Sequence, residues 1–147
     1  MKIDISGLSE LSLKEKWATG PHNYLGLSIN GFPNLFTITG PGSPGVKSNM
    51  MLSIEQHTNW IVDCLQHLRS RRHQRIEVEP EAEENWGSHV REVADSTLYP
   101  LANSWYMGAN IPGKPLIFMP YVGGVHMYKK KCDEVVANGY EGFAISG

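Results

Sequence analysis

Long hydrophobic runs are absent from this sequence of 147 residues, and cysteine is scarce, with two in the whole chain. The apolar stretches are short and interrupted by charged residues, which excludes a membrane-spanning helix and a secretory signal at the charged N-terminus. We therefore expect a soluble, cytoplasmic protein. Cys64 and Cys132 lie far apart in helical patterns, so the sequence predicts two buried free thiols rather than a disulfide.

An excess of charge of either sign is also absent. The chain has 13 basic and 15 acidic residues, for a formal net charge of −2. This balance gives no electrostatic reason to bind nucleic acid or an anionic membrane. The histidines show no metal-ligand spacing, and no serine stands in a nucleophile elbow. We therefore expect no metal site and assign no catalytic residue.

One stretch has the composition of a binding loop. Residues 35–39 form a short apolar run that predicts a buried strand, with Leu35, Phe36 and Ile38 inside. The run ends on Gly40-Pro41-Gly42, and a loop at 40–47 then opens a helix. Main-chain N–H groups at the start of a helix can bind a polar or anionic edge of a ligand. The loop is therefore predicted to form one edge of a site.

The remaining pattern predicts an α/β arrangement of three amphipathic helices against short strands. Helices are expected at 49–71, 80–98 and 124–138, and strands at 2–5, 75–79, 116–119 and 143–145. Ser48 or Asn49 is expected to cap the first helix, with a capping box from Ser53 and Gln56 as the alternative. His57 is placed on the polar side of that helix. Its inward face is predicted to consist of Met51, Ile54, Thr58, Ile61, Val62, Leu65 and Leu68.

Several short motifs in the sequence are more specific than these patterns. They run in the order Trp17, Gly20-Pro21, Gly31-Phe32-Pro33-Asn34-Leu35-Phe36, Gly40-Pro41-Gly42-Ser43-Pro44, Asn49-Met50, residues 103–114 and Tyr121-Val122-Gly123-Gly124. In this order and spacing the chain resembles the C-terminal part of flavin-dependent Baeyer–Villiger monooxygenases of the cyclohexanone and phenylacetone monooxygenase kind. The resemblance covers nearly the whole chain.

This resemblance implies an activity and two cofactors. Enzymes of the family use FAD and NADPH to insert one oxygen of O2 into a ketone, which gives an ester or a lactone. Residues 1–74 resemble the end of the FAD-binding domain, and residues 75–147 resemble a C-terminal segment of helices and loops. The resemblance assigns cofactor contacts to Ser43, Asn49, Met50 and, for NADP, Trp105. It assigns the wall of the ketone pocket to Gly45, Val46 and Lys47.

Two features of the family are absent from the chain. The nearest glycine cluster, Gly40, Gly42 and Gly45, has the letters Gly-x-Gly-x-x-Gly, but no matching acidic residue follows it, so we assign neither FAD nor NADP a phosphate-binding loop here. The family's active-site arginine lies in the upstream part. The chain is therefore expected to form one wall of the flavin, NADP and substrate sites, and to need the missing upstream region or to associate with itself. Lys47 departs from the small or apolar residue usual there, so it points to solvent or meets a negatively charged substrate.

Two alternatives remain open. The chain could belong to a related flavin monooxygenase that oxidises nitrogen or sulfur. It could also be a non-catalytic remnant or interaction module, which the missing nucleotide fingerprints favour. Whether the chain alone is an enzyme is left undecided by the sequence.

Overall fold

The computed structural model describes residues 3–45, 48–101, 105–108, 113, 115 and 117–147. The helices in this part of the chain are α1 (Leu13–Lys16), α2 (Met50–Ser70), α3 (Pro80–Asp95) and α4 (Val125–Ala137). Short 3-10 turns lie at η1 (Leu8–Glu10), η2 (Tyr99–Leu101) and η3 (Trp105–Met107). Strands β1 (Arg75–Val78) and β2 (Phe143–Ser146) pair antiparallel, with Val78 opposite Phe143. The predicted α/β arrangement with three main helices is confirmed.

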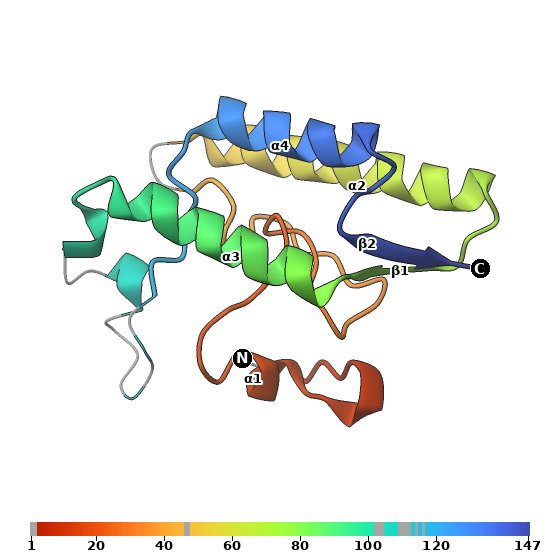
Figure 1. Ribbon diagram of the computed structural model, residues 1–147, viewed down its shortest axis with the longest axis horizontal. Coiled ribbons are helices and arrows are strands. Elements are labelled where there is room, and N and C mark those ends of the chain that lie inside the picture. The colour runs from red at the N-terminus through yellow and green to blue at the C-terminus, as the bar shows by residue number, and fades with distance from the viewer. Residues whose placement is uncertain (1–2, 46–47, 102–104, 109–112, 114, 116) are drawn as a thin grey trace.

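Helices α2 and α4 run side by side along one face of the molecule, and α3 runs below them in the view, in contact with an irregular segment between α1 and α2 (Figure 1). This segment packs against the helices, and its residues Leu25 and Leu27 are buried in the main core. The core draws residues from both halves of the chain: Leu25, Leu27, Trp60, Cys64, Leu68, Ile76, Val78, Trp86, Val90, Tyr121, Tyr128, Cys132, Val135, Tyr140 and Phe143. Both cysteines are buried and free, as the sequence predicts. No helix in the described ranges is long and apolar enough to span a membrane.

Helix α2 begins where the sequence predicts, but it buries a different face. Asn49 is its N-cap, and the Asn49 carboxamide oxygen accepts a hydrogen bond from the N–H of Met51 at 3.0 Å. The predicted inward residue Met51 is 70% exposed, whereas His57, placed on the polar side, is fully buried. The buried face consists of Ser53, His57, Trp60, Cys64 and Leu68.

The prediction was wrong because α2 carries apolar side chains on two neighbouring faces. A period of 3.6 residues marks both faces and does not say which one covers the core of this chain. Burial of His57 costs little because both of its ring nitrogens have partners. The other face, with Met51, Ile54, Val62 and Leu65, is left at the surface of the described chain.

The predicted strand at 35–39 is also wrong. Asn34 and Thr39 have φ of 60° and 54°, so left-handed residues bend the chain before and at the end of the run. Between them, Phe36 makes one isolated bridge with Ser28. Leu35 and Phe36 are half-buried, and Ile38 is 48% exposed. The segment is an irregular strap over the core rather than a buried strand.

Two further predicted strands do not form in the described residues. Residues 3–5 are irregular, and the neighbouring Ser6 makes a single bridge with Ser12. Residues 117–119 join no sheet, and the N–H groups of Ile117 and Met119 instead bond to the carbonyls of Met107 and Tyr106 in η3. Lys2 and Leu116, the first residues of these two predictions, lie outside the described residues. The predicted strands at 75–79 and 143–145 are confirmed as β1 and β2.

The N-terminal segment is attached to α3 by a buried carboxylate. Lys16 forms an ion pair with Glu83 at 2.6 Å, and the other oxygen of Glu83 accepts the N–H of Asn30 at 3.0 Å. Glu83 is 8% exposed. Its carboxylate therefore stabilises tertiary structure, a larger role than complementing the positive end of α3.

Candidate functional site

Helix α2 anchors the start of the glycine loop at 40–45. The N–H of Thr39 donates to Nδ1 of His57 at 2.8 Å, just before the loop begins. Nε2 of the same ring lies 2.8 Å from the hydroxyl of Tyr128 on α4, and that hydroxyl donates to the carbonyl of Leu25 at 2.6 Å. Helices α2 and α4 and the irregular segment thus meet next to Thr39, where the loop begins.

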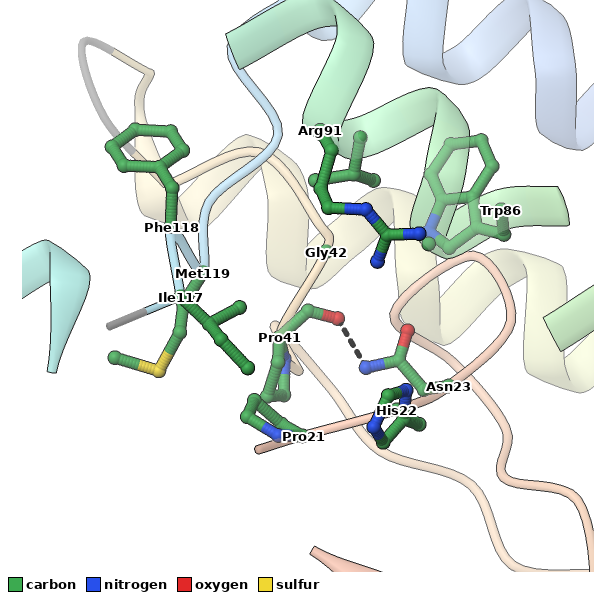
Figure 2. Close-up of a pocket in the computed structure, with 12 residues that line it drawn as sticks. Pro21, His22, Asn23, Pro41, Gly42, Trp86, Arg91, Ile117, Phe118 and Met119 are labelled. Atoms are coloured by element: carbon green, nitrogen blue, oxygen red, sulfur yellow. Dashed lines mark hydrogen bonds between the residues drawn. The ribbon is translucent and has the colours of Figure 1, made fainter. Parts of the chain in front are cut away.

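The loop is also held from the side of α3 (Figure 2). The carboxamide of Asn23 donates to the carbonyl of Pro41 and accepts the N–H of Gly26. Trp86 packs over Gly42, where a Cβ would lie 3.0 Å from the indole nitrogen. Gly42 also has a φ of +78°, so both its conformation and this close contact require glycine.

A third attachment joins the loop to residues 117–121 and, through them, to η3. The N–H of Gly42 donates to the carbonyl of Met119 at 2.6 Å, and the N–H of Tyr121 donates to the carbonyl of Ser43 at 2.9 Å. In turn, the N–H of Met119 donates to the carbonyl of Tyr106 at 3.1 Å. Segments more than 60 residues apart in the sequence are therefore held as one surface.

This surface encloses one side of an open cleft of about 500 Å³. Its lining consists of Thr39, Gly40, Pro41, Ser43, Pro44, Gly45, Met50, Tyr106, Met119 and Pro120. None of these described residues is a carboxylate, histidine, lysine, arginine or cysteine. The wall can thus supply shape, apolar contact and main-chain groups, but no side chain for general acid–base catalysis at neutral pH.

The cleft brings together several residues that the sequence places at a site. Gly45 and Met50 line it directly. Ser43 lines it as well, although its hydroxyl is used within the loop, where it donates to the carbonyl of Gly40 at 2.6 Å. Asn49 adjoins Met50 and uses its carboxamide to cap α2. The predicted roles of these residues as cofactor or substrate contacts remain predictions.

Three other predicted residues are less fully described. Val46 and Lys47 lie outside the described residues. Trp105 is the first residue of η3, directly before Tyr106, which lines the cleft. Its backbone therefore lies at the rim of the cleft, and its proposed contact with NADP stays a prediction.

Sequence reasoning missed His57 and Tyr128. Burial lowers the pKa of His57 to about 4 and raises the pKa of Tyr128 well above its ordinary value, so both are neutral near pH 7. A signal for His57 was present in the spacing of Trp60, Cys64 and Leu68, which marks a second apolar face of α2 that extends back through His57. Nothing in the sequence pairs that histidine with Tyr128 or Thr39.

Comparison with known proteins gives close matches, although no family model matches the chain. The chain is 40% identical over 146 residues to an acetone monooxygenase (methyl acetate-forming) from Gordonia sp. (strain TY-5), covering 99% of the chain and 27% of that relative. A Baeyer–Villiger monooxygenase from Pseudooceanicola batsensis is 38% identical over 140 residues (95% and 25%). A phenazine N-monooxygenase from Lysobacter antibioticus is 36% identical over 144 residues (98% and 26%).

Solved structures agree with these relatives. A steroid monooxygenase bound to NADP matches with a TM-score of 0.89 and 45% identity, over 97% of this chain and 26% of that one. A cyclohexanone monooxygenase from Rhodococcus sp. Phi1 bound to NADP+ matches with a TM-score of 0.94 and 36% identity (99% and 27%). A complex of OTEMO with FAD and NADP matches with a TM-score of 0.90 and 30% identity (98% and 26%). The chain corresponds to a portion of a Baeyer–Villiger monooxygenase.

This Baeyer–Villiger monooxygenase segment spans about a quarter of the length of the relatives it matches. The predicted family is therefore confirmed, with the chain as a fragment of the fold. The comparisons concern flavin-dependent oxidoreductases, and all three of the matched structures above carry NADP, one of them together with FAD. In the described part of the chain, the cleft beside the glycine loop joins segments to which the resemblance assigns cofactor and substrate contacts.

Proposed function

We propose that this chain forms one wall of the flavin, NADP and ketone sites of an FAD- and NADPH-dependent Baeyer–Villiger monooxygenase. The observation that carries the proposal is the cleft itself. It joins the glycine loop, the first residue of α2 and η3, the three segments to which the family resemblance assigns cofactor and substrate contacts. The whole enzyme would insert one oxygen of O2 into a ketone to give an ester or a lactone.

The lining of the cleft fits part of a flavin. Pro41, Pro44, Met50 and Met119 present apolar surface suited to a flat ring system. Helix α2 begins at Met50, and the first N–H groups of a helix have no acceptor within it. Apart from that of Met51, which bonds to the Asn49 cap, these N–H groups suit the polar edge of such a ring. The Gly-x-Gly-x-x-Gly letters at residues 40–45 follow no strand, and α2 begins only at Met50, so the loop lacks the strand–turn–helix setting of a dinucleotide phosphate loop. The chain would therefore complete a flavin site rather than hold the dinucleotide.

The residues of the chain would act on the reaction by position and by exclusion of water. When bound, NADPH supplies the hydride and FAD supplies the redox chemistry that activates O2. The rigid loop 40–45 would cover one side of the ring and keep water from it. Trp105 at the start of η3 would contact NADP, and Gly45, Val46 and Lys47 would shape the ketone pocket.

A second candidate reaction is oxidation of nitrogen. The match to a phenazine N-monooxygenase favours this alternative, at 36% identity against 40% for the acetone monooxygenase. Both reactions would need the same flavin wall, and they differ in the substrate that enters beside Gly45. An interaction module without catalysis is a further alternative, which the assay below also tests.

The test places this chain in a complete flavoprotein. Residues 1–147 replace the matching quarter of the Rhodococcus cyclohexanone monooxygenase, whose fold they share at a TM-score of 0.94. We expect the purified chimera to retain FAD, to oxidise NADPH when a cyclic ketone is added, and to form a lactone. The same assay with phenazine, followed by mass spectrometry, separates ketone from nitrogen oxidation. A chimera that folds but holds no flavin would contradict the proposal.

A matched pair of glycine variants tests the wall directly. Gly45 lies in the cleft, and among the described residues that are not its chain neighbours the nearest atom to a Cβ there would be 3.9 Å away, so Gly45→Leu can fold while its side chain enters the cleft. Gly87 lies on α3 outside the cleft, where a Cβ meets the Arg91 guanidinium at 3.5 Å. We expect Gly45→Leu to weaken flavin retention or to raise KM for the ketone at least fivefold, and Gly87→Ala to change neither. Equal behaviour of the two variants would show that the cleft is not the flavin wall.

A further inference from the structure

The hydrogen bonds around His57 define one protonation state of the ring. Nδ1 accepts the N–H of Thr39, so it carries no proton. The proton of a neutral ring is then on Nε2, which donates to the hydroxyl of Tyr128. That hydroxyl uses its own proton to bond the carbonyl of Leu25. Each donor in this chain of bonds has one acceptor, and the Nε2–H tautomer is the form that satisfies all of them.

The residue that His57 holds has an unfavourable backbone conformation. Thr39 has a φ of 54°, a region that β-branched residues rarely adopt, at a cost of roughly 1–2 kcal/mol. Its N–H bond to His57 offsets this cost. The following residue is closely packed, because a Cβ at Gly40 would lie 2.6 Å from both the carbonyl oxygen of Gly26 and Oγ1 of Thr37. The direction in which the loop leaves Thr39 thus depends on the bond to His57.

We propose that His57 is a positioning residue that sets the glycine loop 40–45, and hence the flavin wall, through its hydrogen bond to the N–H of Thr39. His57 is fully buried and does not line the cleft. Thr39, whose N–H bonds to the ring, does line the cleft, so the ring acts through the backbone and touches neither cofactor nor substrate. This inference rests on the proposed function, because it assigns the purpose of the loop to the flavin site.

The Nδ1 and Nε2 contacts can be separated by two substitutions. The Oδ1 atom of Asn occupies about the place of Nδ1, so His57→Asn keeps an acceptor for Thr39 and loses the bond to Tyr128. The longer side chain of Gln places its amide near Nε2, so His57→Gln keeps a partner for Tyr128 and loses the bond to Thr39. Both variants introduce a buried amide, and a purely structural role for His57 predicts similar behaviour for the two. His67→Gln, on the same helix and partly exposed, is the matched control.

The first measurement is amide hydrogen exchange of the 147-residue chain by NMR. Thr39 exchange is compared with that of Cys132 in α4, which reports global opening. We expect His57→Gln to speed Thr39 exchange at least tenfold relative to Cys132, and His57→Asn and His67→Gln to change this ratio by less than threefold. An equal ratio in His57→Gln and His57→Asn would overturn the positioning role.

The second measurement uses the chimeric enzyme described above. We expect His57→Gln to retain flavin but to raise the ratio of NADPH consumed to lactone formed at least fivefold, and His57→Asn to recover most of the coupling. Coupling that is the same in both variants and in the unsubstituted chimera would overturn the inference while leaving the proposed function standing. A chimera without bound flavin would instead overturn the proposed function, and with it the purpose assigned to the loop.

Discussion

Acidification should destabilise this chain through His57, by an amount that follows from its burial. The pKa of the ring is lowered from 6.5 to about 4 because burial disfavours the charged form. The unfolded chain therefore binds a proton at His57 that the folded chain does not bind between these two values. The contribution of the neutral ring to stability is complete above pH 6.5 and is lost as the pH falls toward 4. Between pH 7.5 and pH 5 this linkage removes about 2 kcal/mol of the free energy of unfolding.

The assay is urea denaturation followed by tryptophan fluorescence at pH 7.5, 6.5, 5.5 and 5. Other groups titrate in the same range, including His89, whose pKa is also lowered by burial. Their contribution is common to the wild-type chain and to His57→Gln, so the difference between the two proteins isolates His57. The hydroxyl of Tyr128, its buried neighbour, has a pKa well above its ordinary value and does not titrate here. We expect the variant to be less stable at pH 7.5 and to lose about 2 kcal/mol less on acidification. Parallel pH profiles for the two proteins would refute the reasoning.

Three further substitutions test other parts of the structure by urea denaturation at pH 7.5. Tyr128→Phe should cost about 2–4 kcal/mol, because it leaves a buried ring N–H and a buried carbonyl without their shared partner. A smaller loss than 1 kcal/mol would mean that water replaces the hydroxyl. Gly40→Ala should cost about 1–3 kcal/mol, since the new methyl group would lie 2.6 Å from the carbonyl oxygen of Gly26. An unchanged midpoint would show that the loop can shift. Glu83→Gln should cost about 2 kcal/mol through the lost charged bond to Lys16, and Glu84→Gln, at an exposed neighbouring site, should be neutral. Equal effects of these two would contradict the buried role of Glu83.

The sequence predicted the helices well and the irregular segment poorly, for physical reasons. Helix α2 is long, periodic and capped by Asn49, so its existence follows from local chemistry. The conformation of residues 34–39 depends on distant partners, such as the carbonyl of Leu27 and the ring of His57, which no local pattern specifies. Apolar composition alone therefore suggested a strand where the chain forms a bent strap.

The candidate site, too, could be predicted only in part from the sequence. The glycine loop and its place before a helix could be seen in the sequence, because glycine and proline mark such turns directly. That Met50 and Tyr106 would share a cleft could not be seen from the letters without the family resemblance, since backbone bonds between residues 117–121 and two other segments bring them together. The face of α2 that covers the core depends on the hydrogen-bond partners of His57, and hydrophobic periodicity does not reveal those partners.

Helix α2 has two neighbouring apolar faces, and within the described chain Met51, Ile54, Val62 and Leu65 on the second face are exposed. A helix of this kind is typical of the interior of a protein larger than the segment seen here. Any polypeptide that packs on the second face would contact the same helix that carries His57 on its first face. A shift of α2 that breaks the bond between the His57 imidazole and the Thr39 N–H would alter the loop at the rim of the cleft. The geometry of the cleft would then respond to whichever neighbour covers the second face of this helix, without any contact between that neighbour and the loop.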